Sequence, residues 1–140
     1  MQQLASFIVN HWELFLALVI IVGLLSGTLL AGKLRGVRSI SPAEAIQLIN
    51  HDRAKVLDVR EENEYADGHI LNSIHIPLAS LEKRVTELEK YKKHPIIVSC
   101  RSGHRSNTAC NSLKKHGHEI VFNLGGGILA WKNANFPVNK

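Results

Sequence analysis

The chain of 140 residues has room for one domain of ordinary size, and its net charge is +5. It contains only two cysteines, which argues against a disulfide-stabilised scaffold. The basic residues do not alternate with aromatic residues in any segment, so nucleic-acid binding is not expected. The eight histidines are scattered along the chain, and we expect neither a metal site nor a cofactor.

Residues 14–31 form an uncharged, apolar stretch near the N-terminus. As a helix it would be about 27 Å long, close to the roughly 30 Å of a bilayer core. Trp12 is typical of an interfacial anchor at one end. We therefore expect a transmembrane helix over 14–31. Small residues recur every four positions along it, a spacing that lets two membrane helices approach and form a homodimer: Gly23, Gly27 and Ala31.

The charges on either side of this stretch predict its orientation. No Lys or Arg precedes it, whereas the linker 32–38 contains Lys33, Arg35 and Arg38. The positive-inside rule places such a linker in the cytoplasm. We expect a single-pass protein of the inner (cytoplasmic) membrane, with residues 1–13 outside and a domain over 39–140 in the cytoplasm. A cleaved signal peptide is the alternative, but it requires a basic segment before the apolar run.

The remainder of the chain alternates between helical and strand patterns. Ser41 and Glu44 form a capping box around Pro42, which marks a helix start. The expected helices cover 42–50, 81–91, 107–116 and 128–134, with a short helical turn inside 60–68. The expected strands cover 55–59, 73–76, 95–99 and 119–122. This alternation predicts an α/β domain with a mostly parallel central sheet flanked by helices.

The most informative segment is 100–106, with the sequence CRSGHRS. It connects the expected strand 95–99 to a helix, and sites in open α/β sheets lie at the carboxyl ends of strands. Backbone N–H groups at a helix start, together with Arg101 and Arg105, favour a thiolate at Cys100. A buried structural thiol would need neither the arginines nor the glycine. We expect Cys110 to be a packed small residue rather than a second reacting thiol.

Three segments, in order, resemble the signatures of the rhodanese family. The first combines LDVR at 57–60 with EYADGHI at 64–70. The second is the loop 100–106, and the third is NLGGGILAW at 123–131, followed by Pro137. The match extends over 40–138, and the apolar N-terminal stretch is similar to that of the tethered single-domain subset. The resemblance implies a rhodanese-like fold and a thiosulfate sulfurtransferase-like enzyme.

The resemblance also implies a role for each site residue. Cys100 would take a sulfane sulfur from thiosulfate or a persulfide, become a persulfide, and pass the sulfur to a thiol or protein acceptor. Asp58 and Arg60 would give structural support through charge-assisted hydrogen bonds. The rest of the loop would bind the substrate, with N–H groups around the outer sulfur and arginines attracting an anionic donor: Arg101, Ser102, Gly103, His104, Arg105 and Ser106.

Two other functions are compatible with parts of the pattern. Related phosphatases use a loop of the form Cys-x5-Arg, whereas Cys100 and Arg105 form the shorter Cys-x4-Arg, which suits one sulfur atom better than a phosphate. A membrane-tethered binding module with little catalysis would serve a membrane partner. The physiological donor and acceptor are left open by the sequence.

Overall fold

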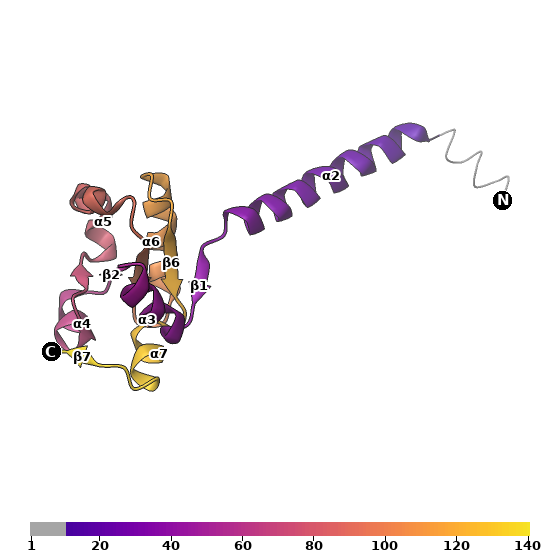
Figure 1. The fold of residues 1–140 in the computed structure, drawn as a ribbon. Coiled ribbons are helices and arrows are strands. Elements are labelled where there is room, and N and C mark those ends of the chain that lie inside the picture. Colours follow the sequence, from indigo (N-terminus) through magenta and orange to yellow (C-terminus); the bar gives the residue numbers. More distant parts are fainter. Residues whose placement is uncertain (1–10) are drawn as a thin grey trace. The chain divides into compact units, whose positions relative to one another are not determined.

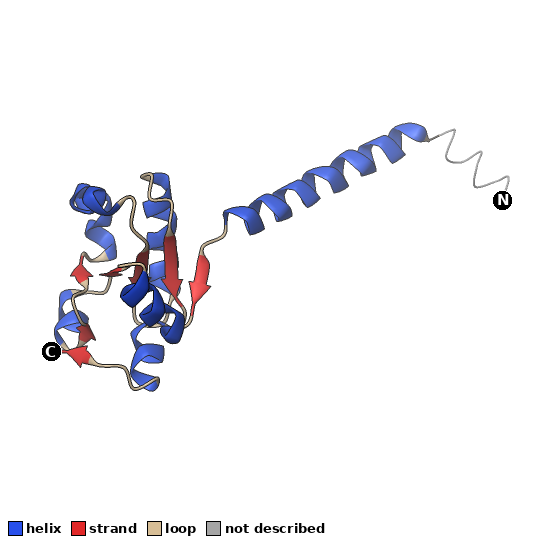
Figure 2. Ribbon diagram, in the orientation of Figure 1, coloured by secondary structure: helices blue, strands red, loops and turns tan. Residues whose placement is uncertain are grey.

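The computed structural model describes residues 11–140, with the exception of the side chains of residues 28–35. Contacts divide the chain into two units, with the boundary in the sequence between Gly36 and Val37. The N-terminal unit contains helix α2 (Trp12–Arg35), and the second unit contains every strand among the described residues (Figures 1 and 2). The predicted boundary between linker and domain, at residues 38 and 39, lies close to this division.

Helix α2 does not support the predicted membrane anchor. Crossing a bilayer core takes about 20 consecutive, predominantly apolar residues. Within residues 11–140, with the same side chains excepted, no helix has the length and apolar character to span a membrane. The predicted transmembrane helix over 14–31 is therefore unsupported. The predicted location, an inner-membrane protein with its N-terminus outside and its domain in the cytoplasm, is wrong for the same reason.

The predicted homodimer also gains no support. A Cβ atom added at Gly23 or Gly27 would meet nothing within 4 Å, so these glycines pack against no other described residue. The side chain of Ala31 lies outside the described part of the structure. Most of the predicted extracytoplasmic segment 1–13 also precedes the first described residue.

The second unit is built on a parallel sheet with the strand order β1-β6-β5-β2-β4. Its strands are β1 (Arg38–Ile40), β2 (Lys55–Asp58), β4 (Ile74–His75), β5 (Ile96–Ser99) and β6 (Val121–Leu124). A small antiparallel pair joins β3 (His69–Ile70) to β7 (Val138–Asn139). This arrangement confirms the predicted α/β class with a mostly parallel sheet.

Except at the short turn between β3 and β4, helices connect the strands. They are α3 (Pro42–His51), α4 (Glu62–Ala66), α5 (Leu78–Arg84), the 3-10 helix η1 (Val85–Tyr91), α6 (His104–Lys115) and α7 (Gly127–Asn133). The predicted capping box at α3 is confirmed, because the Ser41 backbone N–H donates to the Glu44 carboxylate at 2.8 Å and the Glu44 N–H donates to the Ser41 hydroxyl at 3.3 Å.

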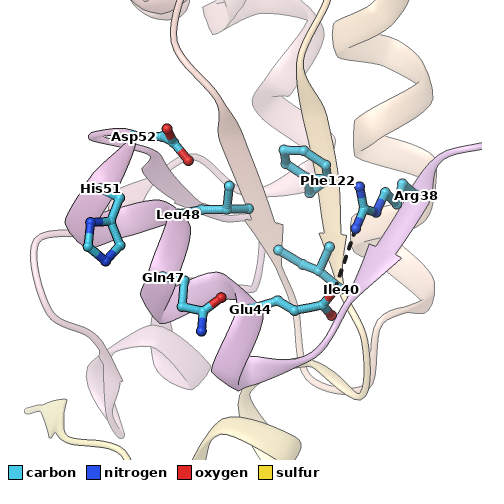
Figure 3. A pocket seen from close by; sticks show the side chains of 8 residues that line it. All are labelled: Arg38, Ile40, Glu44, Gln47, Leu48, His51, Asp52 and Phe122. Atoms are coloured by element: carbon cyan, nitrogen blue, oxygen red, sulfur yellow. Dashed lines mark ion pairs between the residues drawn. The ribbon is translucent and has the colours of Figure 1, made fainter.

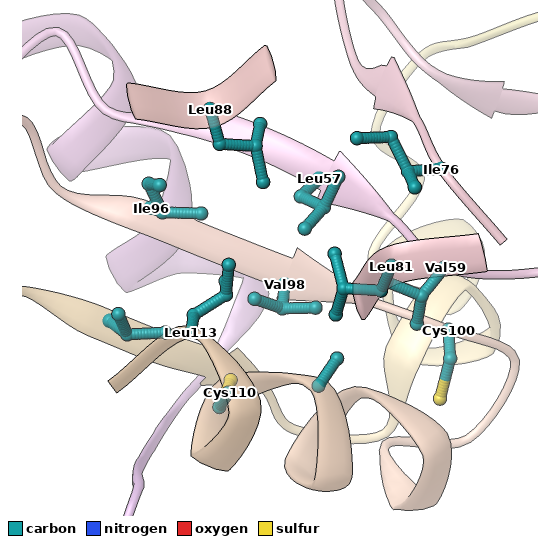
Figure 4. Close-up of a cluster of buried hydrophobic side chains, with 12 residues drawn as sticks. Leu57, Val59, Ile76, Leu81, Leu88, Ile96, Val98, Cys100, Cys110 and Leu113 are labelled. Carbon is teal, nitrogen blue, oxygen red and sulfur yellow. The ribbon is translucent and has the colours of Figure 1, made fainter. Parts of the chain in front are cut away.

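The core lies on both faces of the sheet because successive strand residues point to opposite sides. On β2, Leu57 joins the cluster under α5, η1 and α6, whereas Val56 joins the cluster under α3 and α7. On β5, Val98 and Ile97 divide in the same way. Figure 4 shows the first cluster, which reaches Cys100 at the end of β5.

Three predicted elements differ from the observed ones. The single helix expected over 81–91 is an α-helix followed by a 3-10 helix, with a change of backbone at Arg84 (φ −111°). The strand expected at 119–122 is Val121–Leu124, in register with β1 and β5. The helix expected to start at residue 107 begins at His104, so the end of the cysteine loop is already the first turn of α6.

Candidate active site

Cys100 lies at the carboxyl end of the central strand. Strand β5 ends at Ser99, with β2 and β6 as its neighbours, and Cys100 follows directly. The chain then turns at Gly103, whose φ of 102° favours glycine, and enters α6. The carboxyl ends of all three strands meet at this edge, which is where sites in open α/β sheets form.

The loop curls around the Cys100 sulfur. The Gly103 N–H donates to Sγ at 3.1 Å and the Ser106 hydroxyl approaches Sγ at 3.3 Å. Burial opposes a charge on this residue, which is 1% exposed. The Ser106 hydroxyl, with the backbone N–H groups of Ser106, Gly103 and Ser102, outweighs that effect, and the pKa of Cys100 is lowered. The loop therefore favours a sulfur anion.

Helix α7 supports the loop from behind. The Ile128 N–H donates to the Cys100 carbonyl at 2.8 Å and the Leu129 N–H donates to the Arg101 carbonyl at 3.3 Å. These bonds keep the first carbonyls of the loop facing α7. Gly127 allows the close approach, because a Cβ atom there would clash with the Cys100 carbonyl oxygen and lie 2.6 Å from the Arg101 carbonyl. The glycine run is thus a tight connection and also part of the loop's support.

Arg105 is held by a residue from a distant helix. Its guanidinium donates two hydrogen bonds of 2.7 Å to the carboxylate of Glu64 on α4. The bond to Arg105 lowers the pKa of Glu64 to about 2, and the carboxylate in turn raises the pKa of Arg105. The Arg105 charge also interacts with Cys100. The other two charged or titratable loop residues, Arg101 and His104, are exposed.

The Asp58–Arg60 pair lies beneath this arrangement and is buried. The Arg60 Nε donates to both Asp58 oxygens, at 2.9 and 3.0 Å, and the Arg60 side chain is 4% exposed. The guanidinium also donates to the carbonyls of Glu64 and Gly68, each at 2.9 Å. The pair therefore ties the end of β2 to α4, the element that carries Glu64, and its geometry is that of a structural support.

Asn123 on β6 belongs to the same site, although no role was predicted for it from the sequence. Its side chain is buried, with 8% of the residue exposed. The Ser106 hydroxyl donates to Asn123 Oδ1 at 2.6 Å, and Asn123 Nδ2 donates to the Gly103 carbonyl at 3.1 Å. The sequence signals for it were its place at the start of the third rhodanese-like segment, 123–131, and its position directly after the expected strand 119–122.

One open hollow on this unit, of about 240 Å³, adjoins the loop and is lined by Arg101, Glu64, Leu129 and Lys132 among others. Two others, each of about 290 Å³, contain none of the loop residues. The first of these lies along α3 and β1, and Figure 3 shows its Arg38–Glu44 ion pair.

The second cysteine does not share these features. Cys110 is buried within the core cluster on α6 (Figure 4), and burial raises its pKa to about 12. It is therefore a neutral thiol at physiological pH. Within residues 11–140 the structure has no group of three or more His, Cys, Asp or Glu side chains arranged to hold a metal ion.

Comparisons with known proteins agree with this geometry. The chain is 33% identical over 139 residues to the uncharacterized protein YibN of Escherichia coli strain K12, covering 99% of this chain and 97% of that protein. It is 32% identical to a thiosulfate sulfurtransferase, GlpE, of Coxiella burnetii, over 73% of this chain and 92% of that one. The crystal structure of a rhodanese-related protein from Thermoplasma volcanium superposes with a TM-score of 0.66 at 35% identity, covering 73% of this chain and 97% of that chain. The model of the rhodanese-like domain matches residues 41–134, and the chain therefore belongs to the rhodanese family.

Proposed function

We propose that the protein is a sulfurtransferase in which Cys100 carries a sulfane sulfur as a persulfide. The observation that carries the proposal is the sulfur cradle: Gly103 N–H and the Ser106 hydroxyl both lie within 3.3 Å of Cys100 Sγ. Donors preorganised around a sulfur stabilise negative charge as it develops, in the manner of an oxyanion hole. The thiosulfate sulfurtransferase relative supports the same reaction class.

With thiosulfate as donor, the first half-reaction is a displacement at sulfur. The Cys100 thiolate attacks the sulfane sulfur, a new sulfur–sulfur bond forms, and the sulfur–sulfur bond of thiosulfate breaks. Sulfite leaves with the bonding electron pair, and the persulfide keeps one negative charge. Arg101, exposed at the hollow beside the loop, attracts the anionic donor. Arg105, held by Glu64, adds positive charge near the sulfur.

The second half-reaction regenerates the thiolate. A thiophilic acceptor, such as a thiolate of a small molecule or of a protein, attacks the outer sulfur of the persulfide. The bond between the two sulfurs of the persulfide breaks, and its electron pair returns to Cys100. The N–H cradle receives the negative charge in both halves, so the same groups serve both steps.

The test is intact mass spectrometry of the full chain after thiosulfate treatment, with Cys100→Ser and Cys110→Ser alongside. We expect wild type and Cys110→Ser to gain one sulfur atom, and cyanide to remove it as thiocyanate. Cys100→Ser should gain none. Cys110→Ser is a matched control because a serine hydroxyl can keep the contact of Cys110 with the Phe122 carbonyl, 3.5 Å away.

The alternative function is that of a binding module with the rhodanese fold and little catalysis. A folded wild-type protein that gains no sulfur from thiosulfate or from a small persulfide would favour it. Equal loss of sulfur in Cys100→Ser and Cys110→Ser would instead contradict a mechanism with a single reacting cysteine.

A further inference from the structure

The Ser106 hydroxyl lies between two groups that both attract its proton. On one side it contacts Asn123 Oδ1 at 2.6 Å, and on the other Cys100 Sγ at 3.3 Å. The amide of Asn123 is oriented by its own Nδ2, which donates to the Gly103 carbonyl at 3.1 Å. The orientation leaves only the amide oxygen, an acceptor, facing Ser106. All three side chains are buried, and Ser106 is 0% exposed.

A hydroxyl has one proton, so it cannot donate to both neighbours at once. While Cys100 is a neutral thiol, the short contact with Asn123 is the better bond, and the Ser106 oxygen can accept from the S–H group. Once the sulfur is an anion, a hydrogen bond to it is charge-assisted and about twice as strong as a neutral one. The Ser106 hydroxyl can then donate its proton either to the sulfur anion or to the amide oxygen of Asn123.

We propose that Asn123 is a positioning residue that competes with Cys100 for the Ser106 proton and thereby sets how strongly the cradle stabilises the sulfur anion. Ionisation releases the thiol proton to solvent, while the Ser106 hydroxyl only rotates and keeps its own proton. Asn123 touches neither the sulfur nor a substrate in this scheme; it acts through Ser106. The proposal deepens the proposed function, since it concerns the same sulfur.

Other groups near the sulfur stay constant when Asn123 is changed. Arg105 is the cation that interacts with Cys100, and it is held by Glu64 on α4 rather than by β6. Cys110 is the other titratable group that interacts with Cys100, and it remains neutral. The Gly103 carbonyl loses its bond from Asn123 but still accepts from the Asn107 N–H at 3.3 Å. The turn therefore keeps one of its two restraints.

The test is a pH titration of the thiolate absorbance in the full chain. The part of the absorbance change that is absent from Cys100→Ser belongs to Cys100, because the pKa of Cys110 lies at about 12. Asn123→Leu, similar in shape but without the acceptor, should lower the Cys100 pKa by about half a unit to one unit, roughly three- to tenfold more thiolate below the pKa. Asn123→Asp, a stronger acceptor with a negative charge, should raise it.

The decisive comparison repeats Asn123→Leu in a Ser106→Ala background. If Asn123 acts through the Ser106 proton, the leucine shift should disappear there. An unchanged or raised pKa in folded Asn123→Leu would overturn the proposal, and so would an equal shift with and without Ser106. If Asn123 were purely structural, its variants would have lower melting temperatures. The Cys100 pKa would then not rise in the order Asn123→Leu, wild type, Asn123→Asp.

Asn123→Ala provides a second variant without the acceptor should leucine prevent folding, and the same lowered pKa is expected of it. The titration needs no sulfur donor, so it is separate from the test of the proposed function. A chain that forms no persulfide would still report the order of pKa values. If the chain forms a persulfide but its variants lack this order of pKa values, the sulfurtransferase proposal stands and the proposed role of Asn123 is wrong.

Discussion

Arg105 in the active-site loop and Glu64 on α4 form a bidentate ion pair, with two hydrogen bonds of 2.7 Å across a sequence separation of 41 residues. The carboxylate of Glu64 also accepts from the Glu61 N–H at 3.2 Å, which closes the capping box of α4. One carboxylate thus caps the start of a helix and restrains the loop that carries Cys100. Bidentate arginine pairs give geometric restraint as well as energy.

This pair predicts a specific loss of stability in acid. The pKa of Glu64 falls from its usual 4.5 to about 2 in the folded protein, so the unfolded chain takes up the proton first as pH falls. The stabilisation is complete above about pH 4.5 and is lost towards pH 2. With both side chains partly exposed, it amounts to on the order of 1–2 kcal/mol after allowance for solvent screening.

Urea unfolding of wild type and Glu64→Gln at several pH values measures this effect. The variant should be less stable than wild type at pH 7, and its free energy of unfolding should fall less between pH 5 and pH 3. Glu87→Gln is a matched control, because it removes from η1 the exposed carboxylate that pairs with Arg84. A fall in stability identical in Glu64→Gln and wild type would show that this carboxylate does not carry the acid dependence.

The buried Asp58–Arg60 pair predicts a much larger effect on folding. Removing one member of a buried ion pair leaves the other charge without compensation and costs about 3–5 kcal/mol. Asp58→Ala should therefore destabilise the domain by about that amount, because the remaining Arg60 guanidinium is almost fully buried. Thermal unfolding at pH 7 measures it. Arg38→Ala, which removes an exposed ion pair with Glu44, should cost less than about 1 kcal/mol.

Much of the fold could be predicted because its signals are local. The Ser41–Glu44 capping box lies within four consecutive residues and the β5 strand is a short β-branched run before Cys100, so both were found in the sequence. Strands β3 and β7 have two residues each, too short for a periodic pattern, and they exist only because they pair with each other.

The site was only partly predictable for the same reason. The placement of Cys100 at a strand end follows from adjacent residues. The partners that shape the loop come from elsewhere: Glu64 from α4, Asn123 from β6, and the N–H groups of Ile128 and Leu129 from α7. No single-sequence spacing reports such contacts. The membrane prediction failed differently, because it rested on the length and composition of 14–31 and on the residues that flank it.

The packing of α7 against the loop predicts that Gly127→Ala inactivates the protein. The added methyl group would clash with the Cys100 carbonyl oxygen and lie 2.6 Å from Arg101 backbone atoms, at a φ of 58° that alanine adopts with strain. The loop must move away from α7, and we expect sulfur transfer to fall more than tenfold. Steady-state thiosulfate:cyanide assays measure this loss.

Gly117→Ala is the matched control for this change. Gly117 ends α6 with a φ of 88°, but a Cβ atom there would meet only the Lys92 side chain, at 4.0 Å. Both variants carry backbone strain of about 1–2 kcal/mol, and only Gly127→Ala disturbs the loop. We expect Gly117→Ala to lose stability and keep its turnover. Equal activity in the two variants would mean that α7 does not position the loop.

His118 predicts a second pH dependence, at a site away from the loop. The residue is 2% exposed, and neither of its ring nitrogens has a hydrogen-bond partner among the described atoms. Burial lowers its pKa, and the charges of Lys92 and His116 lower it further. The unfolded chain therefore binds the proton first as pH falls. The contribution of His118 to the free energy of unfolding is constant above about pH 6.5 and declines as pH falls below that value.

His118→Leu should remove both the cost of the unpaired ring nitrogens and the loss of stability in acid, because an apolar side chain of similar size leaves no polar atom unpaired. We expect the variant to be more stable than wild type by about 1 kcal/mol at pH 8 and by a larger margin at pH 5.5. Thermal unfolding at the two pH values measures the difference, with His51→Gln, at the exposed end of α3, as the control. A margin that does not grow in acid would mean that the His118 ring already finds a partner for its proton in the folded protein.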